Sequence, residues 1–135
     1  MEISRNHAHD LVFQTIYSFL ILETCDVPID VQGLVELIFD EPYNEVDTYS
    51  KETLIKALKN QNEIIEYASK FLNKWKFKRL NYCMQAILIM AITEFMYIKE
   101  IEKPIIINIS VKLAKKYGDD KDYRFINGVL DNCLK

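Results

Sequence analysis

The sequence predicts an all-α protein, a compact bundle of six or seven helices. Three observations support this prediction. Apolar residues recur at helical spacing along most of the chain, no segment shows sustained alternation of apolar and polar residues, and three glycines and three prolines leave little material for hairpins or long linkers. Since half of the 135 residues are hydrophobic, we expect one domain over residues 1–135 with a full core.

The N-terminal part is predicted to hold a long helix and a short one. The long helix runs from Ile3 to about Glu23, and its apolar stripe is broad enough that neighbours should enclose most of it. Asp30 can cap the short helix, which should stop before Pro42 because a residue preceding proline disfavours helical geometry. The stripe of the long helix comprises Leu11, Val12, Phe13, Ile16, Tyr17, Phe19, Leu20 and Ile21.

The middle of the chain is predicted to hold one long helix broken near Asn60, or two helices in tandem. Ser50 is expected to cap its start, and apolar residues continue at helical spacing as far as Trp75. The next helix should run from about Asn81 to Ile98. Its core face comprises Met84, Ile87, Leu88, Ala91, Phe95 and Ile98.

The last third reads as two helices joined by a tight corner. Pro104 suits the first turn of a helix, because its fixed φ is already helical and its missing N–H would have no partner there. Gly118 is expected in the left-handed conformation at the end of that helix, and Asp119 or Asp120 to cap the next one. The expected inner faces are Ile107, Val111, Ala114 and Tyr117 in the first helix, and Phe125, Ile126, Val129, Leu130 and Cys133 in the second.

Gly128 lies inside the final predicted helix. A glycine there costs about 1 kcal/mol relative to alanine. We attribute its presence to another backbone that passes close by.

Charge is distributed unevenly along the chain. Residues 1–50 carry ten acids and one base, whereas residues 51–135 carry sixteen bases and ten acids, which gives the net charge of −3. Overall acidity argues against a protein that coats nucleic acid indiscriminately. The uneven distribution still permits one basic face for a polyanion and one acidic face for a basic partner.

Residue types that enzymes and metal sites use are sparse. Only His7 and His9 are histidines, and positions i and i+2 of a helix lie about 200° apart, so a shared metal ion would require an unwound helix start. We interpret both as solvated polar residues at the start of the first helix. The chain also lacks the glycine-rich loops that bind phosphates, and the acids between Asp119 and Asp122 lack the glycine and glutamate of a calcium loop. We therefore expect no catalytic residue, metal or cofactor.

Cysteine usage and hydropathy indicate a cytoplasmic protein without membrane contact. Cys25, Cys83 and Cys133 are odd in number, form no C-x-x-C pair and lie in or beside apolar stretches, which is typical of buried, reduced thiols. The longest apolar run, residues 86–92, is far shorter than the roughly 20 residues that span a bilayer. The N-terminus shows no signal-peptide pattern.

The segment from Lys70 to Arg79 contains five cations, three aromatic residues and no acid. Two interpretations are open. Cations beside aromatic rings suit single-stranded RNA, because phosphates need positive charge and unstacked bases need a flat surface. Alternatively, Phe71, Leu72 and Trp75 belong to the core and the cations are a solvated helix end, which composition alone favours. A weaker basic cluster, for which the solvated reading is also the default, comprises Lys112, Lys115, Lys116, Lys121 and Arg124.

Three segments resemble the NusB family of bacterial transcription antitermination factors. The most specific is Leu113-Ala-Lys-Lys-Tyr-Gly118, followed by Arg124-Phe-Ile-Asn-Gly-Val-Leu-Asp131. The run from Trp75 to Leu80 with Ala86-Ile-Leu and residues 91–95 is similar to a second family segment. Residues 5–10, with Gln14-Thr-Ile-Tyr17, are similar to its arginine-rich start.

The resemblance implies an all-helical adaptor without catalysis. Such an adaptor binds boxA, a short single-stranded RNA element, together with the small-subunit ribosomal protein NusE in the RNA polymerase antitermination complex. It implies RNA contacts at Arg5, Tyr17, Arg124 and Phe125, to which we add Lys121 as a phosphate partner. We further expect Arg5 and Phe125 to meet in one patch, and the acidic first half to face the basic ribosomal protein.

Two departures from the family pattern are expected to weaken RNA binding. The arginine cluster is reduced to Arg5, and Ile89 replaces the arginine after Ala-Ile-Leu. His7 and His9 occupy two of the other places in the cluster, where we expect them to substitute in part for arginine as stacking or pH-dependent RNA contacts. Each lost phosphate contact should flatten the salt dependence by roughly 0.7 log unit. The alternative is a helical protein-interaction module that has kept the fold and lost the RNA site. A homodimer is compatible with the sequence, which locates no interface for it.

Overall fold

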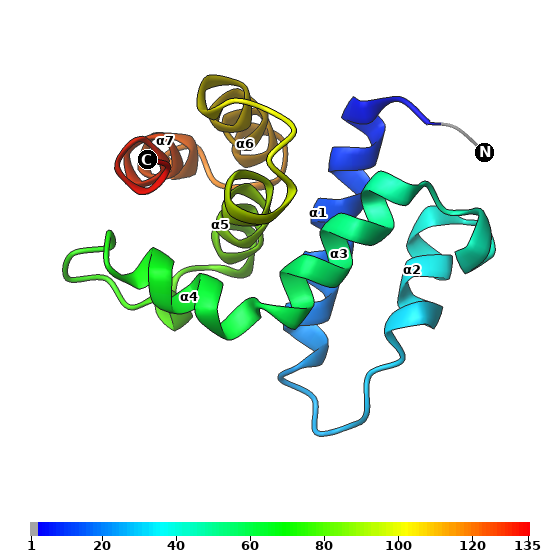
Figure 1. Ribbon diagram of the computed structural model, residues 1–135. Helices are drawn as coiled ribbons and strands as arrows, with labels where there is room; N and C mark the ends of the chain where they lie inside the picture. The colour runs from blue at the N-terminus through cyan, green and yellow to red at the C-terminus, as the bar shows by residue number, and fades with distance from the viewer. Residues whose placement is uncertain (1–2) are drawn as a thin grey trace.

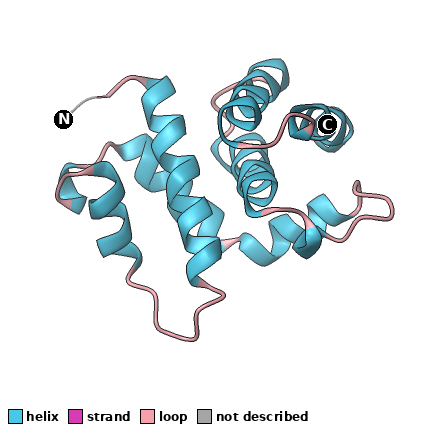
Figure 2. Ribbon diagram, turned by 180° about the vertical axis from the view of Figure 1, so that it is seen from behind, coloured by secondary structure: helices cyan, strands magenta, loops and turns pink. Residues whose placement is uncertain are grey.

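The computed structural model describes residues 3–135, and this part of the chain contains seven α-helices and no strand (Figures 1 and 2). The predicted fold class is therefore confirmed. The helices are α1 Arg5–Leu22, α2 Val31–Phe39, α3 Thr48–Lys59, α4 Gln61–Ser69, α5 Tyr82–Thr93, α6 Lys103–Tyr117 and α7 Asp122–Cys133. Short 3-10 turns span Tyr43–Glu45 and Phe77–Arg79, and a π-helical turn, Glu94–Ile98, continues α5. Within residues 3–135, no helix combines the length and the apolar character that crossing a membrane requires.

Helix α5 lies at the centre of the molecule and packs against α1, α3, α4, α6 and α7 (Figure 1). Every residue from Gln85 to Glu94 is buried, because an apolar surface on all sides of a helix must be covered on all sides. Asn81 caps this helix, since its Oδ1 accepts a hydrogen bond of 2.9 Å from the backbone N–H of Met84. The predicted helix near Asn81–Ile98 is confirmed, and its buried surface is wider than the expected face.

The N-terminal helices begin largely where the sequence predicts. Ser4 caps α1, and Asp30 caps α2 as expected, with its Oδ1 accepting from Gly33 N at 3.0 Å. Helices α3 and α4 follow in tandem and are broken at Asn60. Ser50 is not the cap of α3; Asp47 is, since its Oδ2 accepts from the backbone N–H of Ser50 at 3.0 Å.

The corner between α6 and α7 differs from the prediction. Gly118 has an extended backbone (φ −98°) and not the predicted left-handed conformation. A glycine is needed there for a steric reason, because a Cβ would lie 2.7 Å from Asp122 Oδ2 and 2.8 Å from Ala114 O. Neither Asp119 nor Asp120 caps α7. The Asp122 carboxylate in its first turn accepts hydrogen bonds from the Asp119 backbone N–H (3.0 Å) and from Asn81 Nδ2 (3.2 Å).

Two further expectations for the last third are wrong. Gly128 is exposed and a Cβ added there would meet nothing within 4 Å, so no backbone from residues 3–135 passes close to it. The buried face of α6 is Ile106, Ser110, Leu113 and Ala114, so the predicted face is rotated and Tyr117 reaches the surface. The predicted inner face of α7 is confirmed for Ile126, Val129, Leu130 and Cys133, while Phe125 is half-buried.

The segment after α4 is a loop and does not continue the helix to Trp75. Asn73 adopts a left-handed conformation (φ 55°), which ends helical geometry. Leu72 is buried as expected, but Trp75 is 54% exposed, so its assignment to the core is wrong. Cys83 and Cys133 are buried thiols, whereas Cys25 is exposed, contrary to expectation.

Candidate nucleic-acid interface

The predicted RNA-contacting residues lie in separate places. Arg5, His7 and His9 are in the first turns of α1, and Lys121, Arg124 and Phe125 are at the start of α7. Helices α1 and α7 are separated by α5 and α6 (Figure 1). The structure therefore does not bring Arg5 and Phe125 into one patch, and that expectation is wrong.

Arg5 is held at the N-terminal end of α1 by two contacts. Its guanidinium lies 3.8 Å from the centre of the Tyr49 ring, and its Nη1 lies 3.2 Å from Glu100 Oε2. The side chain remains half-exposed. A phosphate at this position must therefore compete with the Glu100 carboxylate.

The two histidines have opposite environments. His7 is exposed, whereas His9 is 4% exposed, with its Nε2 3.8 Å from Glu94 Oε1 and its ring edge-on to Tyr49 at 5.6 Å. Burial lowers the pKa of His9 to about 4, with a further contribution from the Arg5 charge. Burial also raises the pKa of Glu94 to about 7, although Arg5 acts in the opposite direction. The expectation that His9 is solvated is wrong, and its ring does not offer a face to a base.

Tyr17 belongs to an aromatic cluster where α1 meets the C-terminal end of α6. Its ring, which is 36% exposed, lies 5.9 Å from Phe13, and the Phe13 ring stacks on Tyr117 at 4.9 Å. A surface hollow is lined by these three residues together with Gln14 and Ser18. The sequence placed Tyr117 in the core; its position in the last turn, directly before Gly118, was the available signal for a surface role.

Asp10 connects this cluster to α6. Its carboxylate accepts hydrogen bonds from Tyr117 Oη (2.6 Å) and from Lys116 Nζ (2.8 Å). Burial acts to raise the pKa of Asp10, but these two hydrogen bonds and the Lys116 charge outweigh it and lower the pKa below its ordinary value. The charge of Lys116 is thereby compensated within the protein.

The start of α7 carries two cations, Lys121 and Arg124, that form no ion pair with the described residues, although three aspartates lie beside Lys121 in the sequence. Arg124 is exposed and donates from Nε to Tyr123 Oη at 3.3 Å, and Lys115 Nζ lies 4.7 Å from the centre of the same ring. Lys121 is exposed as well, and neither Lys121 nor Arg124 forms an ion pair with any of residues 3–135. The half-buried ring of Phe125 lies edge-on to Trp75 at 6.4 Å. Exposed charge and aromatic surface therefore coincide here.

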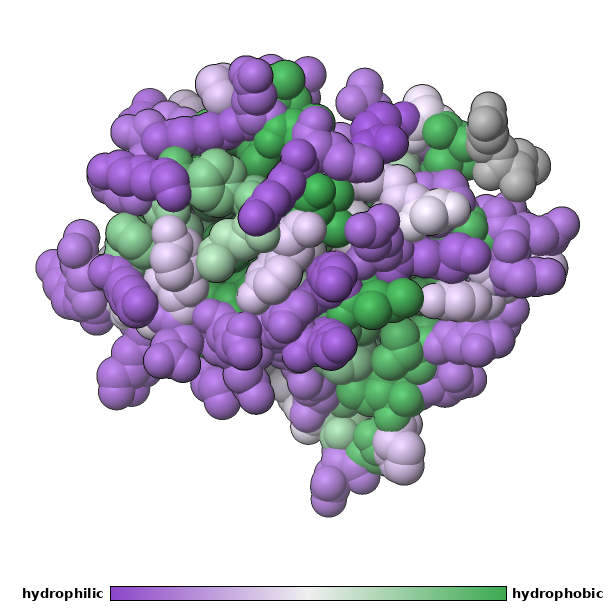
Figure 3. Space-filling model, viewed as in Figure 1, coloured by the Kyte–Doolittle hydropathy of each residue, from purple (hydrophilic) through white to green (hydrophobic). Residues whose placement is uncertain are grey.

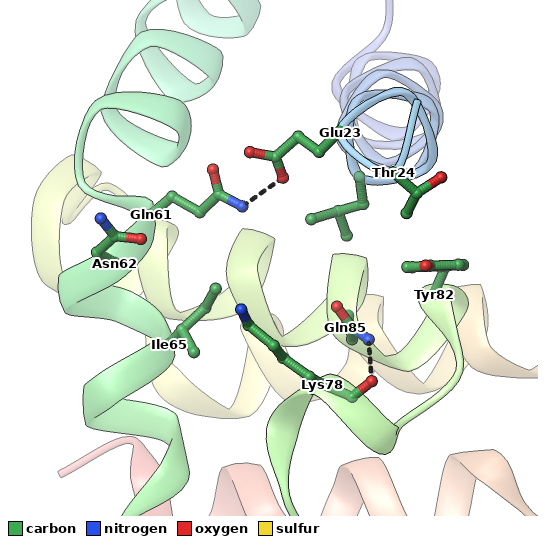
Figure 4. Close-up of a pocket in the computed structure, with 9 residues that line it drawn as sticks. Glu23, Thr24, Gln61, Asn62, Ile65, Lys78, Tyr82 and Gln85 are labelled. Carbon is green, nitrogen blue, oxygen red and sulfur yellow. Dashed lines mark hydrogen bonds between the residues drawn. The ribbon is translucent and has the colours of Figure 1, made fainter. Parts of the chain in front are cut away.

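A polar hollow lies between the end of α1, α4 and α5. Gln61 Nε2 donates to Glu23 Oε1 at 2.9 Å, and Gln85 Nε2 donates to the backbone oxygens of Leu80 and Lys78 at 2.8 and 3.4 Å (Figure 4). The amides are thus occupied within the protein. Among residues 3–135, no group of three or more His, Cys, Asp or Glu side chains is placed to hold a metal ion.

The sequence profile of the NusB family matches residues 6–135. The chain belongs to the NusB family. The transcription antitermination protein NusB of Macrococcus caseolyticus is 33% identical over 132 residues, which cover 98% of this chain and 94% of the relative. NusB of Ligilactobacillus salivarius is 32% identical over 136 residues, which cover 99% of this chain and all of the relative. The family resemblance predicted from the sequence is confirmed.

Solved NusB structures share the fold. The structure of T. maritima NusB matches with a TM-score of 0.84 at 25% identity, covering 99% of this chain and 92% of that one. A crystal structure of antitermination factors NusB and NusE in complex with dsRNA matches with a TM-score of 0.81, covering 96% of this chain and 95% of that one. Its 24% identity shows the shared fold alone.

Proposed function

We propose that this NusB-family protein is a non-catalytic, cytoplasmic RNA-binding adaptor in transcription antitermination. It binds single-stranded RNA of the boxA type together with NusE, within the RNA polymerase antitermination complex. The observation that carries the proposal is the start of α7, where exposed Lys121 and Arg124 have no internal ion-pair partner and adjoin the Phe125 ring. Exposed cations without an ion-pair partner, beside aromatic surface, suit an unpaired strand.

In this proposal Lys121 and Arg124 pair with phosphates, and bases stack on Phe125 and on Tyr17. Arg5 and exposed His7 form a separate contact at the other end of α1; Arg5 lies about 18 Å from Tyr17 along the helix axis, at 1.5 Å per residue. His9 takes no part, because it is buried.

Ile89 is 1% exposed in the centre of α5, so its side chain offers RNA no contact. Together with the reduced arginine cluster at the N-terminus, it remains a departure from the family pattern that we expect to weaken RNA binding.

A titration of fluorescently labelled boxA RNA, with and without NusE and at two salt concentrations, tests the proposal. Arg124→Ala should weaken binding and flatten the salt dependence by roughly 0.7 log unit, because one phosphate contact is lost. Lys59→Ala, which removes an exposed cation at the end of α3, is the matched control and should leave both unchanged. Equal affinity for boxA and scrambled RNA, in both settings, would refute sequence-specific binding.

A second function, a protein-interaction module without an RNA site, is favoured by one observation. The acidic N-terminal half exposes apolar side chains on adjoining helices, with Leu37 of α2 79% exposed and Ile55 of α3 53% exposed. Figure 3 shows apolar surface on this face, between α3 and α2. A pull-down that recovers NusE, while RNA binds only weakly and without sequence preference, would select this function.

A further inference from the structure

The segment between α4 and α5, residues 70–80, concentrates positive charge at the surface, and we call it the Trp75 loop. Lys70, Lys74, Lys76, Lys78 and Arg79 are all exposed, and the chain contains no acid between Glu66 and Glu94. None of these five cations forms an ion pair with any of residues 3–135. By contrast, Arg5, Lys103 and Lys116 each have a carboxylate partner.

The loop is anchored, so the position of its aromatic ring is defined. Leu72 near the start of the loop, and Phe77 and Leu80 near its end, are each at most 5% exposed. Both ends of the loop are therefore packed into the core. The backbone N–H of Trp75 donates to Leu72 O at 3.0 Å across the left-handed Asn73. Trp75 itself stays 54% exposed, although burial of so large a ring would be favourable. An exposed, positioned indole is a feature that core packing does not explain.

The loop is continuous with the start of α7. The rings of Trp75 and Phe125 lie 6.4 Å apart at 79°, and Figure 1 shows the loop after α4 beside α7. Lys74, Lys76 and Arg79 line a surface hollow together with Trp75. Aromatic surface with adjoining cations therefore extends from Phe125 across the loop.

We propose that the Trp75 loop is a second stacking site for single-stranded RNA, adjacent to Phe125. An unpaired base stacks on the Trp75 indole, and the flanking phosphates pair with Lys74, Lys76 and Arg79. The inference rests on the proposed RNA-binding function and extends its site to residues beyond α1 and α7. A single strand fits this surface, because its bases and phosphates are accessible together, whereas a basic protein partner would be repelled by the loop.

The intrinsic fluorescence of the protein gives a direct test, because Trp75 is its only tryptophan. The full chain is titrated with boxA-type single-stranded RNA that carries a dye, with and without NusE. Dye anisotropy reports binding anywhere on the protein, and Trp75 emission reports the loop. We expect Trp75 emission to be quenched along the same binding curve as the anisotropy.

Two sets of variants separate stacking from charge. Trp75→Ala should weaken RNA binding about 5- to 100-fold, while Trp75→Phe, which keeps a flat ring, should retain most of the affinity. Ile105→Ala removes an exposed apolar side chain at the start of α6 and should have no effect. The triple variant K74Q/K76Q/R79Q should lower the salt dependence by about 2 log units. The charge-matched triple K51Q/K56Q/K59Q on α3 should not. Circular dichroism checks that each variant folds.

The outcomes distinguish this inference from the proposed function. If the dye reports RNA binding while Trp75 emission and the affinity of Trp75→Ala stay unchanged, the loop is not an RNA site and the proposed function stands. If neither signal responds to RNA, the proposed function fails and the loop site fails with it. If Trp75→Ala loses NusE and keeps RNA, the loop is a protein contact, which also overturns the inference.

Discussion

The buried pair of His9 and Glu94 shows how neighbours set the chemistry of a residue. The sequence separated His7 and His9 onto different faces of α1, and the structure agrees. It could not identify which face is buried, because the partner, Glu94, lies 85 positions later in the chain. Arg5 is a similar case, since its partner Glu100 lies 95 positions later. Long-range pairs of this kind leave no trace in local spacing.

The shifted pKa values of this pair predict opposite pH responses for two variants. His9, lowered from 6.5 to about 4, contributes stability above pH 6.5 that is lost as pH falls toward 4. Glu94, raised from 4.5 to about 7, contributes stability below pH 4.5 that is lost as pH rises toward 7. Between pH 4.5 and 6.5 the two contributions oppose each other, so the pair in the wild type should add little pH dependence.

Removal of either ionisable group should expose the pH dependence of stability that the other group contributes. Relative to the wild type, Glu94→Gln should lose stability as pH falls from 6.5 to 4.5, and His9→Gln should lose stability as pH rises over the same range. Each slope is at most about 1.4 kcal/mol per pH unit, the value for one proton. Urea unfolding followed by circular dichroism measures it. Slopes of the same sign in both variants would contradict the opposite pKa shifts of His9 and Glu94.

At the level of the helices, the sequence located most elements and missed several of their ends. Asp30 and the break at Asn60 were predicted correctly, because a cap and a change of periodicity are local signals. Ser50 was wrong because Asp47, three residues earlier, offers the same capping chemistry, and the helix starts there. Trp75 was placed in a helix because apolar spacing continues through a segment whose backbone turns at Asn73. Apolar periodicity reflects only the order of side chains in the sequence, and it does not detect such a turn of the backbone.

The two glycines of the last helices predict opposite effects of the same substitution. Gly118→Ala should destabilise the protein by about 1–3 kcal/mol, because its Cβ would meet the Ala114 carbonyl at 2.8 Å and the Asp122 carboxylate at 2.7 Å. Gly128→Ala should stabilise it by about 0.5–1 kcal/mol, because the new methyl group meets nothing within 4 Å in a helix interior. Thermal or urea unfolding of both variants measures the difference. A loss of stability in Gly128→Ala would show that a backbone or partner does approach α7.

At the level of the whole molecule, the sequence predicted a polarised charge distribution but not which cations remain free. The structure pairs Arg5 with Glu100 and Lys116 with Asp10, whereas within residues 3–135 Lys121, Arg124 and the cations of the Trp75 loop form no ion pair. The positions that resemble the family's RNA contacts are therefore unequal in available charge. The difference arises because some cations lie beside a carboxylate in the folded protein and others do not. Only the tertiary structure determines these pairs.

Glu100→Gln should release Arg5 and strengthen RNA binding about two- to fivefold, the range expected for an exposed ion pair. The same RNA titration at low salt measures it, and the gain should shrink as salt is raised. In the double variant Arg5→Ala/Glu100→Gln the gain should disappear. If the double variant keeps it, Glu100 acts on the RNA directly and not through Arg5.

The enclosure of α5 has a consequence for how the molecule comes apart. Because α5 packs against α1, α3, α4, α6 and α7, none of these five helices can detach without exposing part of α5 to water. Its amide hydrogens should therefore exchange with solvent only when the entire chain opens, and at one common slow rate. An RNA or a partner protein that holds one of these five helices in place would therefore also slow the exchange of the α5 amides.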